Sequence, residues 1–120
     1  MSNENGSILL VGLLPNASHA ETLLNNLSEA DFDLNTVSVI MLDVETRNKI
    51  AKDTGPFTGV HPERIKETLL KAGLSESQAG LGAGALVQAK VIVGMELPAA
   101  LLSAAREMFE DQSAQILKVG

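Results

Sequence analysis

Basic side chains gather in one central segment of an otherwise acidic chain. The 120 residues carry a formal net charge of -6, and no lysine or arginine precedes Arg47. Lysines and arginines then recur as far as Lys71, in a stretch interrupted by glycines and prolines. A basic loop of this kind can bind an anionic small molecule or an acidic protein surface; the alternative is a solvated charged face. The candidate ligand-binding residues are Arg47, Lys49, Lys52, Arg64 and Lys66.

Three alternating glycines, Gly80, Gly82 and Gly84, lie in a helix predicted to begin at Ser75. A phosphate-binding glycine loop follows a strand and opens a helix, whereas these glycines precede a strand and lack the Lys-Ser/Thr ending. Small residues instead allow two elements to approach closely. We therefore expect Gly80, Ala83 and Gly84 to form a close-packing or interface surface.

The remaining chemistry-bearing residues do not form a recognisable catalytic or metal-binding pattern. His19 and His61 are the two histidines, and neither has a motif partner at metal-ligand spacing. Asp43 and Glu45 follow a predicted strand and fit a solvated strand end better than a catalytic pair. The chain has no cysteine, so thiolate chemistry and cysteine zinc sites are excluded. We expect no catalytic residue, metal or cofactor, and an enzyme therefore ranks as a third class of function, behind the two weighed below.

Composition and charge exclude further classes. The sequence contains no tryptophan or tyrosine, so aromatic platforms for stacking bases are scarce, and its negative charge opposes binding to nucleic acid. The weakly polar stretch 79–95 is interrupted by Gln88 and Lys90 and is too short to span a bilayer. The first residues, MSNENGS, do not resemble a secretory signal. We expect a cytoplasmic protein with no membrane or nucleic-acid partner.

Two stretches, 8–27 and 90–109, repeat one pattern of an apolar run containing Val-Gly, then a proline, then an amphipathic helix. Each predicts a buried strand followed by a helix. Residues 36–42, half-exposed, and 115–119 are expected to add strands. The order predicts an α+β fold of the ferredoxin-like split β-α-β type, with a four-stranded antiparallel sheet in the order 4-1-3-2 and a helical insertion, residues 44–89, between strands 2 and 3. We expect residues 1–120 to form one domain, with a frayed N-terminus at 1–6.

The two central strands are apolar along their length and need cover on both faces of the sheet. A helix from Ser18 to about Ala30 and a final helix that begins at Pro98 would cover one face. The insertion or a second subunit must cover the other, because a large bare apolar patch is unusual on a monomer. We expect a homo-oligomer, with a dimer favoured, and leave open which of the two covers the second face.

Residues 73–79, GLSESQA, then a helix, then VIV at 91–93 resemble the C-terminal half of small bacterial general-stress proteins with a ferredoxin-like core. The strand VSVI at 37–40 and the following segment, 47–53, are similar to the first half of that family. The resemblance implies the fold and a link to stress, and it brings no catalytic residue.

Two functional hypotheses remain. The first is a non-enzymatic protein, linked to stress, that acts by self-association or by binding a protein partner. The second is a regulatory domain resembling PII-type or ACT-type sensors, which would bind an anionic metabolite through residues 44–89. Because ferredoxin-like domains host many functions, the fold cannot decide between them.

Overall fold

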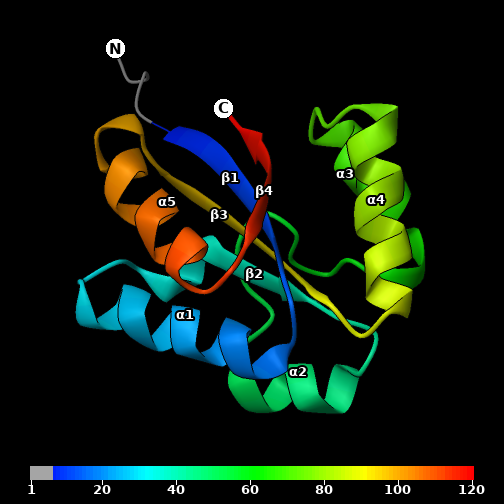
Figure 1. The fold of residues 1–120 in the computed structure, drawn as a ribbon, viewed down its shortest axis with the longest axis horizontal. Helices are drawn as coiled ribbons and strands as arrows, with labels where there is room; N and C mark the ends of the chain where they lie inside the picture. The colour runs from blue at the N-terminus through cyan, green and yellow to red at the C-terminus, as the bar shows by residue number, and fades with distance from the viewer. Residues whose placement is uncertain (1–6) are drawn as a thin grey trace.

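The computed structural model describes residues 7–120, so the predicted frayed segment 1–6 lies outside the described residues. Four strands form one antiparallel sheet: β1 (Ser7–Leu14), β2 (Val37–Ile40), β3 (Val91–Pro98) and β4 (Gln115–Val119). Their order across the sheet is β2-β3-β1-β4, which reads 4-1-3-2 from the β4 edge (Figure 1). The two most continuously apolar segments are therefore the central strands.

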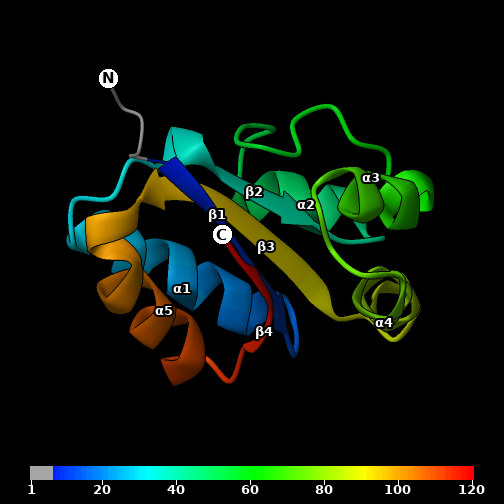
Figure 2. The same ribbon diagram turned by 90° about the horizontal axis from the view of Figure 1, so that it is seen from above.

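One face of the sheet is covered by α1 (Ala17–Glu29) and α5 (Leu102–Asp111) (Figure 2). Two 3-10 turns, η1 (Leu34–Thr36) and η3 (Ala99–Leu101), lead into β2 and α5. Leu23 and Leu27 of α1 and Phe109 of α5 are fully buried against this face. The repeated strand-helix pattern thus builds the first layer of the core.

The insertion contains α2 (Val44–Ile50), the 3-10 turn η2 (Pro62–Arg64), α3 (Ile65–Lys71) and α4 (Glu76–Val87). Helices α3 and α4 lie on the side of the sheet opposite α1 and α5 (Figure 2). A second core cluster joins the sheet residues Val11 and Ile92 to Leu69 and Leu86 of these helices. The insertion therefore covers the second face of the sheet within a single chain.

Phe57, in the loop between α2 and η2, also covers this second face and is only 2% exposed. It lies over Gly94 of β3, where an added Cβ would be 2.5 Å from Phe57 Cε2. On the opposite face, an added Cβ at Gly12 of β1 would be 2.6 Å from Phe109 Cδ2. The glycine of each Val-Gly pair thus leaves room for a phenylalanine.

The edge strand β2 is shorter than predicted, and the half-exposed pattern expected for it is wrong, because all four of its residues are buried. Ser38, the buried polar residue of this strand, donates to Thr54 O at 2.6 Å and accepts from Phe57 N at 2.8 Å. These bonds satisfy the hydroxyl and hold the loop against β2. The loop that carries Phe57 is what buries the outer side of this strand.

Gly82 is the glycine of α4 that packs closely against the core. An added Cβ there would lie 2.9 Å from Leu69 Cδ1 and 3.3 Å from Ile92 Cδ1. At Gly80 or Gly84 it would meet no heavy atom within 4 Å among the residues described. The prediction that these two glycines pack closely inside the molecule is therefore wrong, whereas a role for them between copies stays a prediction.

Candidate binding surface around α2

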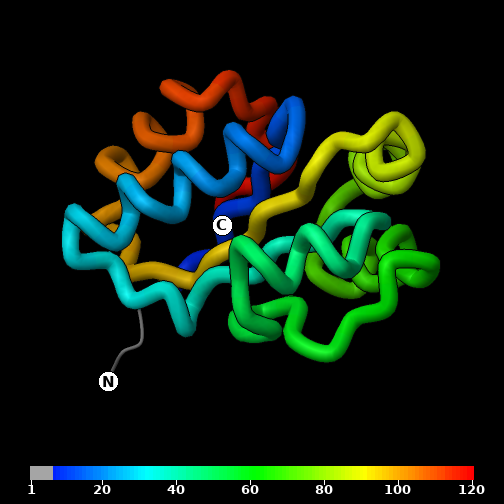
Figure 3. Tube along the Cα trace, turned by 90° about the horizontal axis from the view of Figure 1, so that it is seen from below, coloured from blue at the N-terminus to red at the C-terminus, as the bar shows by residue number. Residues whose placement is uncertain are grey.

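The seven-residue helix α2 lies at the surface, since none of its residues is buried. Its N-cap is Asp43, whose carboxylate accepts from Thr46 N at 3.1 Å and from Thr46 Oγ1 at 2.6 Å. The hydrogen bond from the Thr46 side chain lowers the pKa of Asp43 below its usual value, so the capping carboxylate stays ionised. Helix α2 lies beside the first half of α1 (Figure 3).

Three hollows border α2, and each is lined by a different part of the helix. The lysine groove, beside the C-terminal end of α2, has a volume of about 440 Å³. The arginine pocket, between α2 and the loop 53–62, has a volume of about 270 Å³. The apolar hollow, between the N-terminal end of α2 and the end of α4, has a volume of about 420 Å³. Ligands bind preferentially in pockets and clefts, so the surface around α2 is a candidate binding region.

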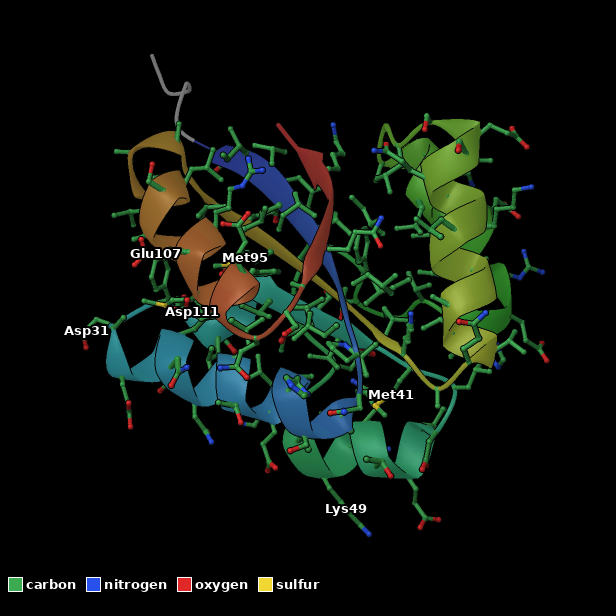
Figure 4. All side chains as sticks on the ribbon, viewed as in Figure 1. Asp31, Met41, Lys49, Met95, Glu107 and Asp111 are labelled. Carbon is green, nitrogen blue, oxygen red and sulfur yellow. The ribbon has the colours of Figure 1, made fainter. Side chains whose placement is uncertain are left out.

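The lysine groove has a mainly apolar floor with polar groups at its rim. Leu24 of α1 and Val37 of β2 are its buried members. Lys49 and Lys52 supply two cations, although the Lys49 side chain extends away from the body of the molecule (Figure 4). Lys49 would have to fold back over the groove to contact an anion there, whereas Lys52 lines it as a second cation. Its polar rim also includes Asn35, Asn48 and Thr54.

The arginine pocket contains a half-sheltered ion pair. The side chain of Arg47 is 17% exposed and that of Asp53 is 54% exposed, and Arg47 Nη1 lies 4.0 Å from Asp53 Oδ1. This separation exceeds hydrogen-bond distance. Asp53 is held in place by Gly59, whose N donates to the two carboxylate oxygens at 3.0 and 3.2 Å. The apolar wall consists of Val39, Ile40, Met41, Val44 and Val60.

The apolar hollow is flanked by aliphatic side chains that face solvent. Val87, the last residue of α4, is 78% exposed, and Leu42 and Val44, on either side of Asp43, are 47% and 46% exposed. Leu42 and Val87 line the hollow directly, and Lys90 lies at its rim. Exposed apolar groups gathered from separate segments mark interaction sites more often than isolated ones do.

The structure divides the five predicted ligand-binding residues. Arg47 lines the arginine pocket, and Lys49 and Lys52 line the lysine groove. Lys66 Nζ lies 3.2 Å from Glu76 Oε1 and so joins α3 to α4. Neither Lys66 nor Arg64 lines any of the three hollows. The basic residues that are close in sequence thus do not make one site.

The sequence reasoning missed two parts of this surface. It did not identify Asp53, although the run DTGPFTG, residues 53–59, has the glycines and hydroxyl residues of a tight loop. It also did not identify Leu42 and Val87 as exposed, since an apolar residue at the end of an element reads as core. Of the two histidines, His19 lies at the start of α1, where its Nδ1 is 2.9 Å from Asn16 Oδ1, whereas His61 lines the arginine pocket.

Within residues 7–120, no cluster of three or more histidine and carboxylate side chains is placed to hold a metal ion. In the same range, every helix is too short or too polar to cross a membrane. Comparisons with protein-family models, with curated proteins and with solved structures found no match to this chain.

Proposed function

We propose that this chain is a non-enzymatic, ferredoxin-like cytoplasmic protein that acts by self-association through the outward face of α4. The ferredoxin-like assignment rests on the two β-α-β halves, in which β1-α1-β2 and β3-α5-β4 interlock in one antiparallel sheet. A link to stress would rest on the resemblance of residues 37–40, 47–53, 73–79 and 91–93 to general-stress proteins.

The exposure of Val87 carries the self-association proposal. Gly80, Gly84 and Val87 follow one another at helical spacing and form one stripe, which we call the α4 stripe. Their neighbours Ala79, Gly82 and Leu86 face the core instead. The small residues would let a second helix approach closely, and burying an aliphatic side chain contributes about 1.5–3 kcal/mol. Leu42, which lines the apolar hollow together with Val87, would extend the contact beyond the helix.

Size-exclusion chromatography with light scattering tests this proposal. We expect a dimer for the wild-type chain, and we expect Val87→Lys to weaken dimerisation about tenfold or more, because a charge would have to be desolvated at the contact. Gly84→Leu should do the same by blocking the approach of the second helix. Leu101→Lys is the matched control, since Leu101 is 44% exposed but lies before α5, away from α4 (Figure 1).

A wild-type chain that stays monomeric at hundreds of micromolar would overturn the proposal. So would a dimer that is indifferent to both α4 substitutions. A dimer disrupted by Leu101→Lys instead would place the interface at the opposite side of the molecule.

The second candidate is an anion sensor resembling PII-type or ACT-type domains, and the lysine groove favours it. Its volume of about 440 Å³ lies within the usual range for ligand pockets. In a thermal-shift screen of nucleotides and phosphorylated metabolites, a ligand at 100 times its Kd should stabilise the fold by about 2.7 kcal/mol. The double substitution of Lys49 and Lys52 by Gln should abolish this shift, whereas Arg64→Gln should leave it unchanged. Equal shifts in all three proteins would rule out the groove.

A further inference from the structure

We propose that the arginine pocket binds a small zwitterion with a compact apolar tail, such as an apolar α-amino acid. The ligand carboxylate would bind Arg47, its ammonium group would bind Asp53, and its tail would pack on the wall formed by β2 and α2. This site is separate from the α4 stripe and from the lysine groove, and the inference does not depend on either.

Arg47 is the anchor for the carboxylate. Its side chain is largely sheltered, at 17% exposed, yet within residues 7–120 the nearest carboxylate oxygen is 4.0 Å away. The separation of 4.0 Å is too long for a hydrogen bond, so this ion pair does not occupy the guanidinium N–H groups. A guanidinium presents a planar fork of donors that matches a carboxylate in a bidentate contact. The position of Arg47 therefore leaves this fork available to a ligand.

Asp53 favours a ligand that carries a cationic group in addition to its carboxylate. Its carboxylate is fixed by the Gly59 N–H, and the loop that carries it is tied to the sheet by buried Phe57 and Ser38. Being 54% exposed, the carboxylate keeps acceptor positions free for a cation. A simple anion bound to Arg47 would be repelled by Asp53 at this range, whereas a molecule with both charges satisfies both residues.

The apolar wall and the volume of the arginine pocket determine the size of the ligand and the nature of its tail. Ile40 is 6% exposed and belongs to the second core cluster, against which Val60 also packs, so these two residues give the pocket a firm apolar side. Val44 on α2 faces them across the pocket. The volume of about 270 Å³ is slightly below the range typical of drug-sized ligands. A branched aliphatic tail of four or five carbons therefore suits the site better than a nucleotide does.

Titration of the full chain with L-leucine, followed by calorimetry and by amide NMR shifts, tests the proposal. We expect saturable binding with shifts centred on Arg47, Asp53 and Gly59. Three probes each lack one feature: 4-methylpentanoate lacks the amine, 3-methylbutylamine lacks the carboxylate, and glycine lacks the tail. Each should bind at least about tenfold more weakly than leucine, since each leaves one charged group or the apolar wall without its partner.

Two variants and one control identify the site. Arg47→Gln and Asp53→Asn should each weaken leucine binding about tenfold or more. Asn at position 53 can still accept from the Gly59 N–H, so the loop should keep its shape, and unchanged amide spectra of the free variant would verify this. Lys66→Gln, which alters a cation outside the pocket, should bind leucine as the wild type does.

A Kd in the millimolar range already corresponds to weak binding. Absence of leucine binding at about 10 mM would therefore overturn the proposal. Binding that survives Arg47→Gln would also overturn it. If 4-methylpentanoate binds as tightly as leucine and Asp53→Asn has no effect, the zwitterion assignment fails even though an anion binds.

Discussion

Replacing Phe57 with alanine is expected to lower the free energy of unfolding by about 3–5 kcal/mol, the usual cost of truncating a buried phenylalanine. Phe57 is 2% exposed and covers the face of β3 at Gly94, so its loss would open a cavity between the loop and the sheet. The main-chain N–H of Phe57 donates to buried Ser38, and a loosened loop would also leave that hydroxyl without a partner. Urea denaturation followed by circular dichroism measures the change.

Phe32→Ala is the matched control, because Phe32 is only partly buried and lies at the edge of the first layer. Its substitution should cost clearly less than that of Phe57. A loss below about 1 kcal/mol at Phe57 would be too small for a filled core position, and it would show that the loop does not cover the sheet in solution.

Opposite effects are expected at two glycines of α4 that are only two residues apart. Gly82→Val should lower the free energy of unfolding by about 1–3 kcal/mol, because the added carbons would collide with Leu69 and Ile92. Gly84→Ala should raise it by about 0.5–1 kcal/mol, because within residues 7–120 of the same chain the new methyl group meets no heavy atom within 4 Å and alanine favours a helix.

Chemical denaturation at two protein concentrations measures both effects and separates any contribution from association, which depends on concentration. Gly80→Ala serves as a second outward position and should behave as Gly84→Ala does. If Gly82→Val were neutral while Gly84→Ala destabilised the monomer, the orientation of α4 on the sheet would be wrong.

The central part of the fold could be predicted because its signals are local. The apolar runs of β1 and β3 were identified as buried strands, and Ser75 was identified as the start of α4, where its hydroxyl accepts from Gln78 N at 3.1 Å. The burial of β2 was missed, because it depends on a loop fifteen or more residues away that folds back over Ser38.

The candidate site was less predictable than the fold. Arg47 and Lys49 are two residues apart in the predicted basic cluster, but a helix turns by about 200° over two residues. They therefore line different hollows. The inward face of α4 could not be chosen from sequence either, since alanine and glycine occur on every side of that helix and give no apolar stripe.

The two glycines that accept phenylalanine side chains have a consequence for cooperativity. In the β1-β3 ladder, Gly12 is paired with Val93 and Gly94 is paired with Val11, so the two positions are diagonal neighbours on opposite faces. Phe109 and Phe57 therefore pack on opposite faces of the same short section of the β1-β3 ladder. Opening either layer exposes hydrogen bonds that the other layer also protects, and the core helices and the insertion should behave as a single folding unit. The insertion is thus as much a part of this domain as the repeated halves between which it lies.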